Sequence, residues 1–433
     1  MEINTSCTVH IYCHTSKREQ IDLFTISESP PVESGLDQYL SDYLNFSISS
    51  SSSKTRQEFI GLLEPSLLFL RLLKNPNFYG LVDVTQDAVS SFLSELIDDS
   101  VNLLQSTNCV SVTDSQAIIP DNNGIIASHY LISINSIQSI LQQLSSTSRL
   151  RGCFESIRLV EEFSNFPVRH GEYEILRNLN LSLPYPQKGS LTDGGSKILI
   201  ILLARISRMD IPKVFSQDLT SSLPQLLSFF HSLVDILAAK GWLLATLSAM
   251  ELSRFTVQRM FQDQNHVTSP LLQLPYFDND TIVKAKTKFG CQISDESRDL
   301  LLEGFSPEQI ETIADFSNSL PIIEVNCDNT ITGPSGSHQS FLIEVARDAP
   351  VGSDHVFAID LPFAKPEFWW FCLASRESNT VLALKRVRIE TEVAVNLKFL
   401  MPTIKKDLDG VLFVISDSYI GLDQEIDLKI VST

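Results

Sequence analysis

The sequence changes character at Pro321, and this change constrains the fold more than any other feature. After Pro321, apolar and polar residues alternate, for example at Phe341, Ile343 and Val345, which is the period of a β-strand. About seven or eight short strands of this kind fill residues 321–433 and predict an immunoglobulin-like or fibronectin-like β-sandwich. Because most of the chain before Pro321 has helical periodicity, we expect a multidomain α+β fold.

Residues 28–122 are expected to form a winged helix. Helical patterns cover 35–44 and 55–74, and a third helix begins with Thr85 as its N-cap. Residues 109–119 then have the pattern of a short hairpin, which would form the wing. A winged helix binds DNA in some proteins and is a packing block inside larger ones, so this prediction leaves its function open.

Two helical units are expected between the winged helix and the sandwich. Residues 123–270 are punctuated by Gly and Pro and predict a helical bundle. Within this bundle, Asp235–Phe261 has the pattern of a helix, a Gly-Trp pair and a second, amphipathic helix. Residues 271–320 predict a helix–loop–helix, whose last helix begins at Ser306 with a capping-box arrangement.

The first 27 residues contain one strand-like run, Thr8–Cys13. A single strand cannot form a domain, so residues 1–27 are interpreted as the end of a preceding domain. Four potential zinc ligands lie in or beside this run: Cys7, His10, Cys13 and His14. As ligands they would need a tight loop, whereas the apolar flanks favour a buried strand, so we expect no metal site.

Charge and cysteine content narrow the functional classes. The formal net charge is −19, whereas proteins that bind nucleic acid hold phosphate with Lys and Arg. The acidic surface therefore favours protein partners over general nucleic-acid binding.

Seven scattered cysteines indicate a reducing, intracellular compartment rather than a disulfide framework. No signal peptide is predicted, and the apolar stretches 198–204 and 226–250 are expected to be buried helices of a soluble protein without a membrane span.

The sequence contains no motif for phosphate binding or catalysis. A phosphate loop needs the order G-x-x-x-x-G-K-[ST], and Gly194–Lys197 has the wrong order. The run Gly333–His338 lacks the spacing of a nucleophile motif and is expected to be a surface loop. We therefore expect no catalytic residues, no cofactor and no enzyme activity in this chain.

Eight motifs, in order along almost the whole chain, resemble one protein family. They are Pro31–Ser34, Asn75–Tyr79, Pro167–His170, Ile206–Met209, Gly241–Trp242, Ala249–Leu252, Leu274–Pro275 and Ser416–Glu425. The chain resembles the spliceosomal U5 small nuclear ribonucleoprotein helicases, and more closely their C-terminal cassette. Helicases of the activating-signal-cointegrator type are similar but match less well.

The resemblance implies an organisation and a function. In the family, a cassette has two RecA-like domains, a winged helix and a Sec-type unit, which comprises a helical bundle, a helix–loop–helix and an immunoglobulin-like domain. Residues 1–27 would then be the last strand of the second RecA-like domain, and the ATPase domains would be missing. The chain would be a non-catalytic scaffold for splicing proteins in the nucleus, with ATP and Mg²⁺ expected only for the missing domains. An endoplasmic-reticulum translocation component shares the Sec-type unit and supplies the alternative function, but it would need membrane spans that are not apparent here.

The resemblance also implies candidate nucleic-acid contacts. The family's ratchet helix, which lines the nucleic-acid channel, matches Leu243–Phe261. The candidate RNA-contacting residues lie on this helix and in the motif before it: Arg205, Ser207, Arg208, Arg254, Gln258 and Arg259. Residues 196–265 contain seven Lys or Arg against five Asp or Glu, so a weak phosphate track is compatible with the local charge. A solvated helix face is the alternative explanation for Arg254 and Arg259. Pairing with acidic neighbours in the bundle is the alternative for Arg205 and Arg208.

Trp369 and Trp370 are the candidate partner-binding residues. Adjacent residues of a strand face opposite sides of a sheet. We expect one ring to fill the core and the other to lie on a surface or at an interdomain seam. An exposed aromatic ring there would suit the interface with a splicing protein.

Overall fold

The chain forms two compact units, and each is described by itself. The computed structural model describes residues 10–26, 32–51, 54–261, 270–278, 280–283, 302–348, 355–358, 360–403 and 408–432. The first unit is Met1–Ser106 with Val110–Pro120, and the second is Thr107–Cys109 with Asp121–Thr433. Helical bundle and β-sheets therefore belong to one unit.

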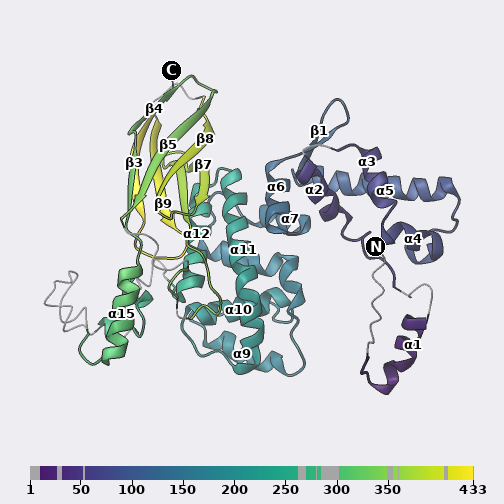
Figure 1. The fold of residues 1–433 in the computed structure, drawn as a ribbon, viewed down its shortest axis with the longest axis horizontal. Helices are drawn as coiled ribbons and strands as arrows, with labels where there is room; N and C mark the ends of the chain where they lie inside the picture. The colour runs from purple at the N-terminus through teal and green to yellow at the C-terminus, as the bar shows by residue number, and fades with distance from the viewer. Residues whose placement is uncertain are drawn as a thin grey trace, which may run out of the picture. The chain divides into compact units, whose positions relative to one another are not determined.

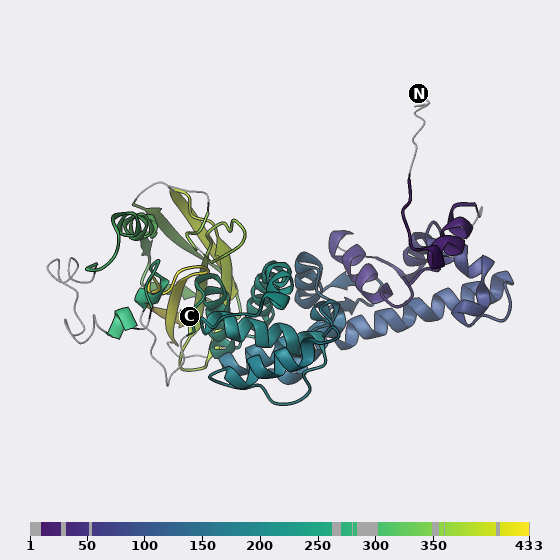
Figure 2. The ribbon, with the colours of Figure 1, turned by 90° about the horizontal axis from the view of Figure 1, so that it is seen from below.

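The first unit is a set of helices followed by a small hairpin (Figure 2). Its elements are η1 (Thr15–Lys17), α1 (Arg18–Ile26), α2 (Leu40–Ser51), α3 (Arg56–Leu63), α4 (Leu67–Lys74), η2 (Pro76–Tyr79), α5 (Gln86–Ser106), β1 (Val110–Val112) and β2 (Ile118–Pro120). Helices α2 and α5 contact each other and bury Leu44, Ile48, Leu93 and Ile97. The antiparallel pairing of β1 with β2 confirms the predicted hairpin.

Two helix predictions in this unit need correction. The single helix expected over 55–74 is two helices, because Pro65 has no N–H to continue the helical bonds. A new helix then begins at Ser66, whose Oγ accepts a hydrogen bond from the N–H of Phe69 at 3.2 Å. The helix expected over 35–44 begins at Leu40, after a turn, and continues to Ser51.

The strand expected at Thr8–Cys13 is also wrong where it can be checked. His10–Cys13 form no strand, Tyr12 is 94% exposed, and among the described residues no strand pairs with this run. Thr8 and Val9 lie outside the described residues, as does the potential ligand Cys7. No group of three or more metal-binding side chains occurs in the part of the chain that the structure describes.

The helical bundle forms the first part of the second unit (Figure 1). Its elements are α6 (Asn122–Tyr130), α7 (Ile134–Gln143), α8 (Leu150–Ser156), η3 (Ile157–Leu159), η4 (Glu161–Asn165), α9 (Glu172–Ser182), α10 (Gly194–Ile206), η5 (Lys213–Phe215), α11 (Ser216–Ala239) and α12 (Leu243–Gln258). The helix–Gly-Trp–helix prediction is confirmed, because α11 and α12 flank Gly241 and Trp242 and pack on each other.

Helix α10 is buried along its whole length, and its first residues show why. A Cβ on Gly194 would lie 2.1 Å from the carbonyl oxygen of Phe163, and one on Gly195 would lie 2.7 Å from Cα of Arg158. Only glycine allows this close approach. Lys197 follows with no exposed surface, and its Nζ lies 2.6 Å from Glu172 and 2.8 Å from Asp218. This Gly-Gly-Ser-Lys segment is therefore a packing and ion-pair element.

Two β-sheets with a common hydrophobic core complete the second unit. One has the strand order β4-β10-β9-β6-β7 and the other β3-β5-β8. The strands are β3 (Ile323–Cys327), β4 (Thr330–Gly333), β5 (His338–Arg347), β6 (Trp369–Ser375), β7 (Thr380–Val387), β8 (Glu392–Leu400), β9 (Leu408–Ser416) and β10 (Gln424–Ser432). All pairs are antiparallel except β4 with β10. The α+β class is confirmed.

Two short helical elements, η6 (Pro270–Gln273) and α15 (Pro307–Ser319), lie between bundle and sheets in the sequence. The capping box predicted at Ser306 is confirmed, since Ser306 and Gln309 exchange side-chain-to-backbone hydrogen bonds of 2.9 and 3.3 Å. The first half of the predicted helix–loop–helix falls largely on residues 284–301, which lie outside the described residues.

Candidate functional site

A buried charge cluster joins the bundle to the five-stranded sheet. Its centre is Asp417, which directly follows β9 and has no exposed surface. Asp417 Oδ2 lies 2.7 Å from Lys365 Nζ and 2.6 Å from Arg386 Nη2. From the bundle side, Nε2 of His231 on α11 lies 4.0 Å from the same oxygen. The sheet and α11 therefore meet at a buried cluster of polar and charged groups.

The pKa values of the cluster follow from its burial and its charges. Burial alone would raise the pKa of Asp417, but the neighbouring Lys365 and Arg386 cations outweigh it and hold that pKa well below its usual range. Burial, together with the Arg386 charge, holds the pKa of His231 well below its ordinary value. His231 is therefore neutral at neutral pH, and Asp417 is ionised.

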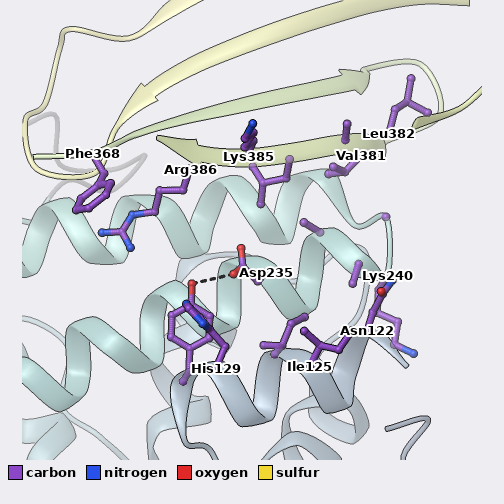
Figure 3. Close-up of a pocket in the computed structure, with 17 residues that line it drawn as sticks. Asn122, Ile125, His129, Asp235, Lys240, Phe368, Val381, Leu382, Lys385 and Arg386 are labelled. Atoms are coloured by element: carbon purple, nitrogen blue, oxygen red, sulfur yellow. Dashed lines mark hydrogen bonds between the residues drawn. The ribbon is translucent and has the colours of Figure 1, made fainter. Parts of the chain in front are cut away.

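Arg386 connects this cluster to a pocket on the other side of its side chain. Its guanidinium lies 4.4 Å from the ring centroid of Phe368 and 5.8 Å from that of Trp370. Such contacts hold a cation against an aromatic face at low dielectric. Figure 3 shows Arg386 extending from β7 toward Phe368, above the helix that contributes Asp235.

The pocket, here called the β7 pocket, lies between α6, the C-terminal part of α11 and β7 (Figure 3). Its volume is about 900 Å³. At its base the Tyr130 hydroxyl donates a hydrogen bond of 2.8 Å to Asp235, and burial raises the pKa of both groups. The polar and charged residues of its lining are Asn122, His129, Tyr130, Asp235, Lys240, Lys385 and Arg386.

The arginines predicted to contact RNA lie elsewhere, at the C-terminal ends of α10 and α12. We call this region the arginine junction: Arg205, Arg208, Arg254 and Arg259. The Nη1 atom of Arg254 donates to both carboxylate oxygens of Asp423, at 2.6 and 2.8 Å. Arg259 lies 3.2 Å from the Asp360 carboxylate, and Arg205 donates to the main-chain oxygen of Asp360 at 2.9 Å.

Arg208 makes the most contacts within the junction. It donates to the main-chain oxygens of Arg259 at 3.0 Å and Phe277 at 2.8 Å, and also to that of Leu272. These acceptors come from the C-cap of α12, from η6 and from the segment that follows η6. The guanidinium of Arg208 thus replaces hydrogen-bond partners that irregular backbone would otherwise lack.

The structure contradicts the nucleic-acid interpretation for three of the six candidates. Arg205 is 4% exposed, and Arg254 and Gln258 are each 6% exposed, so none of them presents a surface to a phosphate. Gln258 donates to the main-chain oxygen of Ser418 at 2.9 Å. Burial lowers the pKa of Arg205 to about 10, which leaves it cationic at neutral pH.

The other three candidates, Ser207, Arg208 and Arg259, are partly exposed. The main-chain N–H of Ser207 donates to Leu203, and both guanidinium groups are engaged within the chain. Neither alternative that the sequence left open describes the junction. Arg254 and Arg259 pair with carboxylates outside the bundle instead of forming a solvated helix face. Arg205 and Arg208 donate to main-chain oxygens instead of pairing with acidic side chains of the bundle.

The tryptophan prediction is right about the two sides, and of the two places left open for the second ring the structure shows the interdomain seam and not the surface. Trp369 faces the core between the sheets, and its Nε1 donates to Glu367 at 2.6 Å. Trp370 faces the bundle, where its ring packs edge-on against His231 at 5.8 Å between centroids. Both rings are 0% exposed, so neither is available as a partner-binding anchor.

Sequence reasoning missed the residues that now define the site. Asp417 lay inside the motif Ser416–Glu425, which carried the resemblance but was assigned no role. Lys385 and Arg386 belong to none of the eight motifs that carry the resemblance. The pairing of Asp417 with Lys365 spans 52 residues and has no local signature, so only the fold reveals it.

The fold and site define a class of protein: a helical bundle fixed to a two-sheet β domain by buried ion pairs, together with a helical unit that ends in a two-stranded hairpin. Residues 120–429 match the family model of the Sec63 Brl domain, and residues 33–114 match a winged helix-turn-helix domain model. The chain therefore belongs to the Sec63 Brl domain family, with a winged helix before that domain.

Curated relatives agree with this assignment. The chain is 31% identical over 434 residues to the U5 small nuclear ribonucleoprotein 200 kDa helicase of Drosophila melanogaster, covering 97% of this chain and 20% of the relative. The Homo sapiens protein of the same name is 30% identical over 429 residues, with the same coverage. A Dictyostelium discoideum protein named activating signal cointegrator 1 complex subunit 3-like is 29% identical over 447 residues, covering 98% and 20%. The chain thus spans about a fifth of these relatives' length.

One helical stretch in the described part of the chain, Lys213–Ala239, is long and apolar enough to cross a membrane. Of its most apolar window, 67% is buried inside the protein, and α11 is the central helix of the bundle. Length and composition alone therefore do not make it a membrane span.

Proposed function

We propose that this chain works as a non-catalytic protein-interaction scaffold of a spliceosomal RNA helicase of the U5 type, in the nucleus. The family relationship supports the helicase context. In this proposal the two-sheet domain is immunoglobulin-like and residues 1–27 are the end of a RecA-like domain. ATP and Mg²⁺ belong to RecA-like domains and not to the residues described above.

One observation carries the choice of a protein scaffold over an RNA-binding unit. The cations on the helix that would line a nucleic-acid channel are bonded to oxygen atoms of the chain itself, as Arg254 is to Asp423. RNA binding depends on cations that neutralise phosphates, so RNA contact should be weak and of secondary importance. The net charge of −19 favours the same conclusion.

Fractionation of cells that express the tagged chain tests the proposal. We expect the tagged chain to sediment with U5-containing particles from a nuclear extract. This association should persist when the tagged chain is treated with ribonuclease before it is mixed with the extract. Recovery in microsomes would instead support the alternative, a component of protein translocation in the endoplasmic reticulum. RNA-stimulated ATP hydrolysis that copurifies with the chain would contradict the non-catalytic assignment.

A further inference from the structure

The strand β7 has an edge that is only partly covered. It is the last strand of the five-stranded sheet, so β6 pairs with one side of it. At the start of β7, the N–H of Val381 donates to the oxygen of Gly241 at 3.0 Å, and the N–H of Leu243 donates to the oxygen of Asn379 at 3.3 Å. The Gly-Trp turn therefore covers the first residues of the edge. Beyond Val381, no further backbone partner of this edge occurs among the described residues.

A β-bulge fixes which backbone groups face that edge. The register of β6 on β7 pairs Leu373 with Ala383 and Ala374 with Val381, so Leu382 is the extra residue. Alternate residues of an antiparallel strand direct their N–H and C=O groups to opposite sides. Because Val381 faces the edge and the bulge adds one residue, Leu384 and Arg386 are the next residues to face it. Unpaired groups at a sheet edge are a template for another strand.

The β7 pocket lies along this same stretch of edge. Val381–Arg386 line it on the sheet side, and α6 and α11 line it on the other. The six residues of the edge span about 20 Å at about 3.3 Å per residue, which is the length of a short extended peptide. Ile125 of α6, which is 48% exposed, and Ala238 of α11 supply apolar surface for alternate side chains of such a peptide.

The charge of the pocket selects the kind of peptide. Its lining has three cations, Lys240, Lys385 and Arg386, against one carboxylate, Asp235. That carboxylate is engaged by the Tyr130 hydroxyl. Lys240 and Lys385 are exposed, in a chain whose net charge is −19. A positive pocket attracts an anionic segment.

We propose that an extended acidic segment of a partner protein adds to β7 as an antiparallel strand in the β7 pocket. The backbone groups of Leu384 and Arg386 set its register, and Lys240 and Lys385 receive its carboxylates. This is strand addition, in which main-chain bonds give affinity and side-chain contacts give specificity. The inference rests on the proposed scaffold function and names the class of partner and its site.

Synthetic peptides test the site directly. The probe is a fluorescein-labelled decapeptide of alternating Glu and Val, titrated with the full chain in a fluorescence anisotropy assay. Two comparison peptides replace every Glu by Lys, or methylate alternate backbone nitrogens of the Glu peptide. We expect saturable binding of the unmodified Glu peptide, and binding at least about tenfold weaker for both comparison peptides. Equal binding of the methylated peptide would overturn strand addition.

Charge reversal at the pocket supplies the second arm. The variant Lys240→Glu with Lys385→Glu should bind the Glu peptide at least about tenfold more weakly and gain affinity for the Lys peptide. The matched control reverses two exposed lysines elsewhere on the sheets, Lys398→Glu with Lys429→Glu, at the same net charge. If the control loses as much affinity as the pocket variant, the interaction is non-specific and the proposal fails.

A third variant removes one edge donor. Proline at an edge position whose N–H faces outward leaves the inner ladder intact, so Leu384→Pro should fold and lose peptide binding. If this variant does not fold, the charge-reversed pair alone decides.

A single-stranded RNA 12-mer that displaces the peptide, and binds with the same dependence on Lys240 and Lys385, would show that the pocket serves nucleic acid. The outcomes also separate the two proposals. If the wild-type chain and the charge-reversed chain both sediment with U5 particles, the scaffold proposal stands and the β7 pocket proposal fails.

Discussion

The arginine junction and the β7 pocket both concentrate cations in an acidic chain, but they use them in opposite ways. In the junction, Arg205 and Arg254 are buried and donate to oxygen atoms of the sheets' connecting segments. In the pocket, Lys240 and Lys385 are exposed beside an open strand edge. The junction ties segments of the chain together, whereas the pocket leaves its lysines available to a partner.

The difference teaches that a count of cations along the sequence does not locate a binding surface. Residues 196–265 have a local excess of Lys and Arg, yet this excess is used where α10 and α12 meet the segments around 272–277 and 417–423. Whether a cation is available to a partner depends on the number of oxygen acceptors that the chain itself places around it. Arg386 shows both uses at once, since it is paired to Asp417 on one side and lines the pocket on the other.

The largest expected effect comes from removing the anion at the centre of the internal cluster. Asp417→Ala should lower the free energy of unfolding of the second unit by about 3–5 kcal/mol, because it leaves the buried Lys365 and the partly buried Arg386 without their counter-ion. Urea unfolding followed by tryptophan fluorescence measures this, since all three tryptophans lie in that unit. Asp427→Ala is the control, with a side chain that is 90% exposed, and should change stability by less than about 0.5 kcal/mol.

A direct comparison of one cation from each region comes next. Arg254→Ala should cost about 1.5–3 kcal/mol of stability, because it removes two charge-assisted hydrogen bonds to Asp423 from a side chain that is 7% exposed. Lys385→Ala should cost less than about 0.5 kcal/mol, because its side chain is exposed. The same unfolding assay compares them. Equal costs for the two variants would mean that the junction and the pocket are not different in kind.

The pH dependence of stability tests the buried cluster of Arg386, Asp417 and His231. His231 has a folded-state pKa held below its unfolded value of about 6.5, so the unfolded chain binds the extra proton as pH falls. This contribution to stability is present above pH 6.5 and is lost below it. The loss in the free energy of unfolding reaches about 1.4 kcal/mol at pH 5.5. The His231→Gln variant should lack that loss between pH 7.5 and 5.5. The carboxylates facing the site, Asp417 and Asp235, are present in both proteins, so their own contributions cancel in the comparison.

The smallest effect distinguishes the two tryptophans. Trp369→Phe removes the hydrogen bond to Glu367, whereas Nε1 of Trp370 is buried and has no partner among the described residues. Both variants lose a similar apolar volume, so the difference between them isolates that bond. We expect Trp369→Phe to be less stable than Trp370→Phe by about 1 kcal/mol in thermal unfolding. A Trp370→Phe variant that is the less stable one would mean that the bundle seam packs more tightly than the core between the two sheets.

Much of the fold could be predicted from the sequence, because local patterns determine it. Alternation at Phe341, Ile343 and Val345 predicted β5, and the Ser306 capping box predicted the start of α15. The incorrect predictions were those in which a local apolar pattern was overridden by a neighbouring residue or by the lack of a pairing strand. Pro65 split one apolar helical pattern into α3 and α4, and the apolar run before His14 has no sheet to join.

The candidate site could not be predicted in the same way, because its contacts are long-range. The Arg254–Asp423 pair spans 169 residues, and a helical pattern does not reveal which oxygen atoms will surround the end of a helix. The β7 pocket depends on a strand order that places β7 at the end of its sheet, next to α11.

The salt dependence of RNA binding tests the central claim, that the junction cations belong to the interior of the protein. A fluorescein-labelled single-stranded RNA 12-mer would be titrated at low and rising salt with the wild-type chain and with Arg254→Ala combined with Arg259→Ala, both checked by circular dichroism. We predict the same weak affinity and the same log–log salt slope for both proteins. A slope that becomes less negative by about 1.4, the value for two lost phosphate contacts at about 0.7 each, would show that these arginines hold RNA and would contradict the account.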